Sequence, residues 1–430
     1  MLSLEKGSLR SQLSYSVVVN AISIAINFLI QILIVRYFGV ADFGRFAYWK
    51  NNIQLSSSLS LFGFNSASIR FLPQLLEPSL NKNLKKFLRT SYLLIALLAT
   101  LCAVVIIWGV PNRLTDTRLM KALPTLASVL AMPLVIVMSS QLRIIGSLKR
   151  AIFLERLGYQ SLFLLSIIGL IYLTAIRSPL SLAQTFSAAL CLTLVIISAY
   201  LWRALEKRNQ LKKMTQHNVV VQAPSWGKSI PIFFFLAVGN TINLRIGIFV
   251  VGAMLSAKAT GQFAFMQALA GIATFPLFSF NQIVGPRISV LNTQNNIAAI
   301  KPLVGRVQIL SLFIGAFLAV AIYLATPIIS WMTTELNVVV PIVFIVLLLA
   351  TIVNAGFGPV GTALAMVGGE KYAARYTLAA AIIKVPLLFL LISKFGLIGA
   401  AIGELVTILL WNLAMQFRLY KILSQKMVKT

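Results

Sequence analysis

The chain has 430 residues, of which 59% are hydrophobic and only 11% are charged. A soluble domain carries about 25% charged residues, so this composition excludes an ordinary soluble globular protein. The low fraction of charged residues places the chain in lipid, and its formal net charge of +28 makes it a basic protein.

Apolar runs long enough to cross about 30 Å of hydrocarbon as helices recur along the whole chain. We predict about twelve spans, near residues 14–35, 46–67, 91–111, 122–142, 157–176, 180–202, 230–255, 262–285, 307–331, 338–364, 375–393 and 396–417. Barrel strands need only about 10 alternating residues, so these longer runs predict helices. The expected fold class is an all-α integral membrane protein.

The N-terminus does not have the pattern of a cleavable signal. Lys6 and Arg10 precede a first span that contains polar residues and lacks a small-residue cleavage site. Most Lys and Arg residues fall in the loops on the side of both termini, so the positive-inside rule predicts that both termini are cytoplasmic. These cations are scattered over short loops, which predicts contacts with anionic membrane lipids and no binding of nucleic acid.

Two segments of the chain repeat the same pattern. Gly44-Arg45-Phe46-Ala47-Tyr48 follows the first span, and Gly261-Gln262-Phe263-Ala264-Phe265 follows the seventh, 217 residues later. The same offset superposes Arg70 on Arg287. An internal repeat of half the chain in a hydrophobic protein is typical of transporters.

The repeat predicts two six-helix bundles of parallel orientation, related by an axis along the membrane normal. Residues 1–202 would form the first bundle and residues 230–430 the second. Residues 203–229 are basic and polar, and we expect them to be a cytoplasmic linker.

Polar side chains recur at helical spacing inside several predicted spans. The first span carries Ser16, Asn20, Ser23, Asn27 and Gln31 along one helix face. Polar groups are costly in hydrocarbon, so such stripes predict either a hydrated cavity or interhelical hydrogen bonds that hold a bundle together. We favour a cavity lined by the first, second, seventh and eighth spans, with these substrate-binding candidates: Asn20, Asn27, Gln31, Lys50, Gln54, Asn240, Asn243, Arg245 and Lys384.

Three cations and one carboxylate lie at or toward the interior of the predicted spans: Lys50, Arg245, Lys384 and Glu404. An unpaired charge at the bilayer centre costs about 2.5–3.5 kcal/mol on insertion scales, so we expect each of these residues to have a structural or functional role. The cations could bind an anionic head group such as a phosphate or pyrophosphate. Alternatively, Lys384 pairs with Glu404 as a structural ion pair, or Lys50 extends to the interface. Glu404 is also the candidate for ion coupling.

Metal and cofactor sites are not expected. The sole histidine, His217, lies in a polar loop, and Cys102 and Cys191 fall inside predicted spans as small core residues. We therefore predict no catalytic residue, no metal and no cofactor.

The first repeat also carries a family resemblance. Leu33-Ile-Val-Arg-Tyr-Phe-Gly-Val-Ala-Asp-Phe-Gly-Arg-Phe-Ala47, Leu61-Phe-Gly-Phe64 and Ile69-Arg-Phe71 resemble the amino-terminal signature of polysaccharide biosynthesis proteins. These are O-antigen-type lipid-linked oligosaccharide flippases of the multidrug/oligosaccharidyl-lipid/polysaccharide (MOP) exporter superfamily. Later motifs continue the resemblance, namely Gly252…Gly261-x-Phe263, Gly368-Gly-Glu-Lys371 and Gly396-x-x-Gly399-Ala-Ala401.

The resemblance implies a MATE-like fold whose two bundles enclose a V-shaped cavity. It also implies movement of an undecaprenyl-pyrophosphate-linked oligosaccharide from the cytoplasmic to the outer leaflet of a bacterial inner membrane, with other glycan-assembly membrane proteins as partners. One motif departs from the family. Members often carry an Asp and a basic residue where this chain has Gly247-Ile248. Arg245, two residues earlier, could supply the positive charge instead.

Three other functions remain alternatives. A lipid II type flippase would use the same fold and a similar head group. A drug exporter for cations should display interior carboxylates, which are scarce here. A glycan polymerase or ligase should carry a sizeable outer loop with catalytic residues, and the sequence predicts no such loop.

Overall fold

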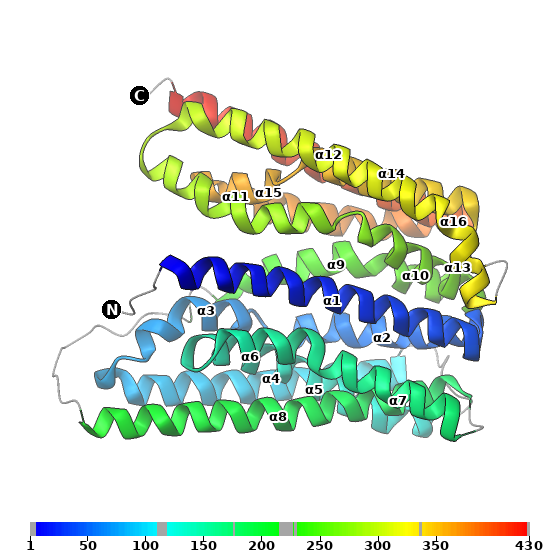
Figure 1. The fold of residues 1–430 in the computed structure, drawn as a ribbon, viewed down its shortest axis with the longest axis horizontal. Coiled ribbons are helices and arrows are strands. Elements are labelled where there is room, and N and C mark those ends of the chain that lie inside the picture. The colour runs from blue at the N-terminus through cyan, green and yellow to red at the C-terminus, as the bar shows by residue number, and fades with distance from the viewer. Residues whose placement is uncertain are drawn as a thin grey trace. The chain divides into compact units, whose positions relative to one another are not determined.

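The computed structural model describes residues 6–109, 118–174, 177–214, 227, 230–334 and 338–427. Within these ranges the chain forms helices and no strand (Figure 1). The helices are α1 (Lys6–Phe38), α2 (Val40–Ser60), α3 (Phe64–Leu75), α4 (Asn81–Gly109), α5 (Arg118–Ile145), α6 (Leu148–Phe153), α7 (Tyr159–Leu173), α8 (Pro179–Met214), α9 (Ile230–Met254), α10 (Ala257–Ile272), α11 (Phe275–Thr293), α12 (Ile300–Leu324), α13 (Thr326–Thr333), α14 (Pro341–Phe357), α15 (Val360–Leu364) and α16 (Glu370–Met427).

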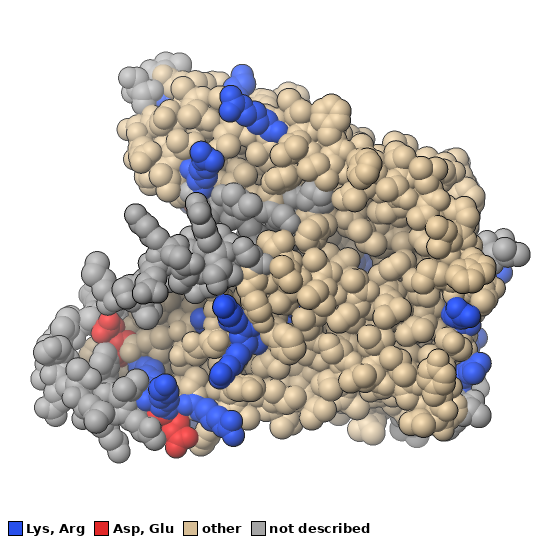
Figure 2. Space-filling model, in the orientation of Figure 1, with Lys and Arg blue, Asp and Glu red and all other residues tan. Residues whose placement is uncertain are grey.

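Eight helical stretches in the described chain are long and apolar enough to cross a membrane. The last, Pro341–Met427, contains three of the predicted spans. Two predicted spans, 46–67 and 262–285, are not among the eight. In the structure the chain bends inside both, between α2 and α3 and between α10 and α11, and both are rich in polar residues. On the face shown in Figure 2, most of the surface is uncharged and Lys and Arg side chains gather toward the left and right ends. The all-α membrane fold is confirmed.

The internal repeat is present in the order of the elements. Helix α2 begins at Val40 and α10 at Ala257, again 217 residues apart. A short 3-10 turn precedes α4 in the first half and α12 in the second. Each half also contains one π-helical turn, at Leu154–Gly158 and at Ala365–Gly369. The repeat therefore extends beyond the Gly-x-Phe-Ala motif to a series of elements in the same order.

Contacts divide the chain into two compact units. Unit 1 contains the residues up to Phe38 together with Trp49–Val238, and unit 2 contains Gly39–Tyr48 together with the residues from Gly239 onward. The division falls inside α2 and inside α9, so each half of the sequence contributes a short segment to the unit built mainly by the other half. Residues 203–214 of the predicted linker form the end of α8, and most of the remaining linker lies outside the described residues.

Aromatic packing organises the core of unit 1. Helix α5 packs against α3, α4 and α8. The ring of Phe186 on α8 meets the rings of Trp49, Tyr159 and Phe163 edge to face, with centroids 5.2–5.9 Å apart. The Trp49 indole N–H donates to the Thr125 hydroxyl at 2.9 Å. A buried Trp N–H needs such a partner, and this hydrogen bond fixes the start of the unit 1 part of α2.

A helical hairpin in α16 depends on glycine. Gly396 has φ 57° and ψ −133°, a conformation that side chains disfavour, and the chain reverses there. The two arms then approach so closely that a Cβ on Gly399 would lie 2.0 Å from the carbonyl oxygen of Leu391. Only glycine allows this backbone contact without displacement of one arm.

We predict that Gly399→Ala destabilises the protein by about 1–3 kcal/mol, the usual cost of overpacking. The matched control is Gly305→Ala on α12, where an added Cβ meets no atom within 4 Å. This control should be neutral or stabilising, because alanine favours helix. Thermal unfolding in detergent measures both variants, and equal melting temperatures would contradict the close approach.

Candidate functional site

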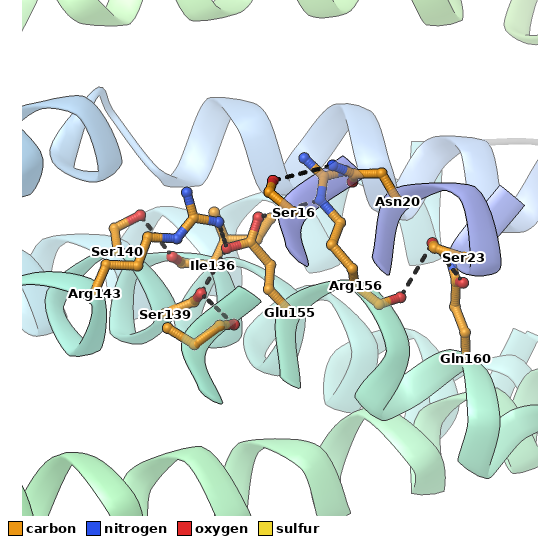
Figure 3. A network of polar contacts seen from close by, with 11 residues as sticks. Ser16, Asn20, Ser23, Ile136, Ser139, Ser140, Arg143, Glu155, Arg156 and Gln160 are labelled. Carbon is orange, nitrogen blue, oxygen red and sulfur yellow. Dashed lines mark hydrogen bonds and ion pairs between the residues drawn. The ribbon is translucent and has the colours of Figure 1, made fainter. Parts of the chain in front are cut away.

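Helix α1 carries the first predicted polar stripe, and the structure shows how part of it is used. Asn20 and Gln31 are buried, and Asn27 is partly exposed. The Asn20 amide donates to the Ser16 hydroxyl at 3.4 Å. The Ser23 hydroxyl lies 2.9 Å from the side-chain amide of Gln160 and donates to the carbonyl of Arg156 at 3.3 Å (Figure 3). At Ser23, therefore, the stripe connects helices through hydrogen bonds.

Helix α2 presents Lys50 and Gln54 one turn apart, so both side chains leave the same face of the helix. Both are partly exposed. The Lys50 ammonium lies 5.5 Å from the centroid of the Phe186 ring. A cation at this distance from an aromatic face is stabilised by the ring quadrupole. Unit 1 thus holds Lys50 in place while part of its side chain remains exposed.

Helix α9 carries Asn240, Asn243 and Arg245, which differ in their surroundings. Asn240 is exposed and Arg245 is partly exposed, whereas Asn243 is 3% exposed. The Asn243 amide donates to the carbonyl of Thr377 on α16 at 2.9 Å. Asn243 therefore joins α9 to α16, while Asn240 and Arg245 keep part of their surface exposed.

Lys384 and Glu404 form a buried ion pair in unit 2. The Lys384 ammonium donates to the Glu404 carboxylate at 2.6 Å and to the backbone carbonyl of Asn243 at 2.5 Å. The two residues are 1% and 6% exposed. Of the two interpretations that the sequence leaves open for Lys384, the structure has the ion pair, and in this conformation Lys384 is enclosed.

The pair leaves two acceptor oxygens unused. Glu404 Oε1 and Asn243 Oδ1 are buried and make no hydrogen bond within the described chain. A Cβ on Gly247 would lie 2.4 Å from Glu404 Oε1, so a glycine on α9 makes room for the carboxylate. Buried oxygens without a donor are costly, so this cluster has capacity for one further proton or another positive charge.

A second ion-pair cluster, in unit 1, was not predicted from the sequence. Glu155 accepts from the Arg143 guanidinium and from the Ser139 hydroxyl, both at 2.6 Å, and Arg156 lies 3.9 Å from its other oxygen (Figure 3). The span boundaries place Arg156 in a cytoplasmic loop and leave Glu404 as the only carboxylate within the spans. The π-helical turn at Leu154–Gly158 instead turns Glu155 toward α5. In the sequence, only the scarcity of acidic residues could have drawn attention to Glu155.

The structure divides the predicted site residues between the two units. Unit 1 holds Asn20, Asn27, Gln31, Lys50 and Gln54, and unit 2 holds Asn240, Asn243, Arg245, Lys384 and Glu404. Within unit 2, Asn243, Lys384 and Glu404 come together in one cluster. A shared cavity lined by both sets stays a prediction. Among the described residues no group of three His, Cys, Asp or Glu side chains could hold a metal ion.

The ion pair in unit 2 gives a test of its structural role. Lys384→Met leaves Glu404 buried without its partner, and we expect a loss of about 3–5 kcal/mol in stability, the usual effect of breaking a buried pair. The double variant Lys384→Met/Glu404→Leu removes both charges and should recover most of this loss. Thermal unfolding of the purified variants measures the effect. A double variant no more stable than Lys384→Met would show that the two charges do not depend on each other.

Comparison with known proteins places this fold. No protein-family model and no curated protein matches the sequence. Solved structures do match over nearly the whole chain. An inward-facing multidrug resistance MATE family transporter of the MOP superfamily superposes with a TM-score of 0.67 at 11% identity, covering 93% of this chain and 95% of the other. The outward-facing conformation of such a transporter gives 0.62 at 12% identity, covering 97% and 96%.

The lipid II flippase MurJ in an inward closed conformation gives a TM-score of 0.62 at 13% identity, covering 96% of this chain and 90% of that chain. A point mutant of the Vibrio cholerae MATE transporter VcmN gives 0.57 at 15% identity, covering 97% and 98%. At such low identities the likeness establishes the fold. The chain therefore has the MATE-like fold, which transporters and a lipid II flippase of the MOP superfamily share.

Proposed function

We propose that this protein is a flippase for a lipid-linked anionic glycan. It would move an undecaprenyl-pyrophosphate-linked oligosaccharide, such as an O-antigen or another surface polysaccharide unit, from the cytoplasmic to the outer leaflet of a bacterial inner membrane. The solved structures with this fold are transporters and a flippase, which supports transport and gives no support to enzyme activity.

The observation that carries the proposal is the sign of the charge in the polar spans. Residues 14–35, 46–67, 230–255 and 262–285 contain Lys50 and Arg245 but no Asp or Glu. Both cations are partly exposed. Amides and cations in low-dielectric surroundings attract an anion and repel a cationic drug.

The fold suits the physical task of flipping. A sugar-pyrophosphate head group does not cross hydrocarbon unaided, because it would lose its hydration, while the prenyl tail remains stable in the lipid. Amide side chains such as Gln54 and Asn240 can replace water around the sugar, and Lys50 and Arg245 can hold the pyrophosphate. The protein then needs to expose this polar surface to each side in turn, with no bond made or broken.

Glu404 is the residue that we propose for ion coupling. Its carboxylate is paired with Lys384 through one oxygen, and the other oxygen has no donor within the described chain. Protonation of Glu404 would remove the negative charge beside Lys384 and free the ammonium, which is held by α9 and α16. A proton arriving at this cluster would thus change how those two helices are joined.

A lipid II type flippase is the second candidate, because MurJ shares the fold over most of both chains. The head groups of both substrates carry a pyrophosphate, so the same cations serve either one. The two functions differ in their cellular consequences. We expect loss of a cell-wall precursor flippase to cause lysis, and loss of a surface-glycan flippase to leave cells intact without that glycan.

Substitution of the exposed cations tests the proposal. Lys50→Gln and Arg245→Gln should each lower the rate of glycan flipping by about tenfold, the effect of losing about 1.4 kcal/mol from a charge-assisted contact. Lys50→Arg and Arg245→Lys keep the charge and should retain most activity. The measurement is glycan exposed at the outer leaflet, normalised to the amount of protein in the membrane.

Lys394→Gln serves as the matched control, because Lys394 is exposed and lies at the end of a predicted span. It should behave as the unaltered protein. Full flipping activity in both Lys50→Gln and Arg245→Gln would rule out an anion site built from these two cations.

A further inference from the structure

The end of unit 2 where α12 begins and α16 finishes is strongly basic. The contact of Lys301 on α12 with Tyr420 on α16 brings these two ends together (Figure 1). Residues 297–310 and 410–427 contain no Asp or Glu, and their cations are Lys301, Arg306, Arg418, Lys421 and Lys426. Within the described chain, Lys301 and Lys421 are exposed and form no ion pair. This end of unit 2 therefore has positive charge available for an anion.

A polar cluster joins α12 to α16 at this end. We call it the lysine–tyrosine cluster, and it consists of Lys301, Gln308, Gln416 and Tyr420. The Lys301 ammonium lies 5.4 Å from the centroid of the Tyr420 ring. The Gln416 amide donates to the Tyr420 hydroxyl at 3.1 Å and accepts from the Gln308 amide at 3.0 Å. Gln308 also donates to the carbonyl of Phe357, the last residue of α14, at 2.9 Å. The cluster is therefore held in place by three helices.

Two hydrogen-bond donors of this cluster are available to a ligand. The Tyr420 oxygen accepts from Gln416, so its own proton can be donated elsewhere. The Tyr420 ring attracts the Lys301 ammonium through its quadrupole, and this contact leaves the N–H groups of the ammonium free to donate. Both side chains keep part of their surface exposed. An ammonium beside a phenol O–H is well suited to phosphate oxygens, because charge-assisted hydrogen bonds are the strong ones.

Apolar side chains lie next to the cluster on the outside of unit 2. Ile309 follows Gln308 on α12, and Phe417 follows Gln416 on α16, and they are 60% and 73% exposed. The cluster pairs early residues of α12 with late residues of α16, so the two helices run antiparallel there. In antiparallel right-handed helices, the residues that follow two facing residues turn to the same side of the pair. Ile309 and Phe417 therefore share one outward face.

This apolar face extends along α12 and has open space at its basic end. Phe313 and Phe317 lie one and two turns beyond Ile309 and are also exposed. A Cβ on Gly305, one turn before Ile309, would meet no atom within 4 Å. Basic side chains and a tyrosine at the end of an exposed apolar face match the two parts of a phospholipid, whose charged head lies at the interface and whose acyl chains lie in the hydrocarbon.

We propose that the lysine–tyrosine cluster binds the phosphate of an anionic membrane phospholipid. Lys301 and Tyr420 donate to the phosphate oxygens, and the acyl chains lie along the face formed by Ile309 and Phe417. Lys421, one turn beyond Phe417, adds a second positive charge on the same side of α16. The bound lipid bridges the start of α12 and the end of α16 and stabilises this end of unit 2. A free phosphate ion has the head-group contacts alone, and a zwitterionic lipid lacks the net negative charge.

Lipid titration of the purified protein in detergent tests the site without a glycan substrate, so its outcome does not depend on the proposed function. Phosphatidylglycerol is compared with phosphatidylcholine of the same acyl chains and with inorganic phosphate. Native mass spectrometry measures retained lipid, and thermal unfolding measures stabilisation. Phosphatidylglycerol should be retained and should raise the melting temperature by several degrees, because it binds the folded state. The other two probes should produce no such shift.

Variants of the cluster locate the binding. Lys301→Gln should weaken phosphatidylglycerol binding about tenfold, the effect of losing one charge-assisted contact. Tyr420→Phe keeps the ring and removes the hydroxyl, and it should weaken binding about fivefold. Gly305→Leu fills the open space without a change of charge and should also weaken binding. Lys394→Gln is the matched control, since it removes an exposed lysine beside the hairpin turn at Gly396, and it should bind the lipid as the unaltered protein does.

Three results would overturn this site. Equal weakening by Lys301→Gln and Lys394→Gln would show that the lipid responds to net charge alone. An equal thermal shift with inorganic phosphate would assign the cluster to a free anion and remove the role of the apolar face. Equal binding of phosphatidylcholine and phosphatidylglycerol would show that the cations do not select the head group.

Discussion

The scarcity of charge inside a hydrocarbon environment is the constraint on which the rest of the structure depends. A polar group in lipid must find a partner within the protein, so each one that remains reports a structural or functional need. Lys384, Glu404 and Asn243 meet the requirement with an enclosed cluster that joins α9 to α16. Lys50 and Arg245 remain partly exposed, and we propose that they contact the head group.

The duplication of the chain extends to its backbone but not to its charges. Helices α2 and α10 begin at equivalent residues, and each half contains a π-helical turn. The ion pairs, however, occupy different places: the partly buried Glu155 pairs with Arg143 on α5, whereas the buried Glu404 pairs with Lys384 within α16. The duplication therefore covers the backbone elements, whereas the ion pairs differ between the two units.

Much of the fold follows from the sequence, because span length and the 217-residue repeat are one-dimensional signals. The Lys384–Glu404 pair was also predicted as an alternative, because Glu404 is the only carboxylate in the predicted spans and lies in the span next to that of Lys384. The Glu155 cluster was not predicted, because the expected span begins only at residue 157. The structure instead places Glu155 in a π-helical turn. The exchange of Gly39–Tyr48 into unit 2 was missed as well, because only tertiary contacts show where a continuous helix changes its partners. A shared cavity between residues of both units remains a prediction.

The central claim is that the polar stretches of α2 and α9 carry an anionic head group. The most direct measurement is transbilayer transfer by the purified protein in liposomes, with a fluorescent short-chain prenyl-pyrophosphate saccharide compared against a lipophilic cationic dye. The account predicts transfer of the anionic lipid, competition by unlabelled prenyl pyrophosphate, and no transport of the dye. Transport of the cation with no transfer of the pyrophosphate lipid would contradict it.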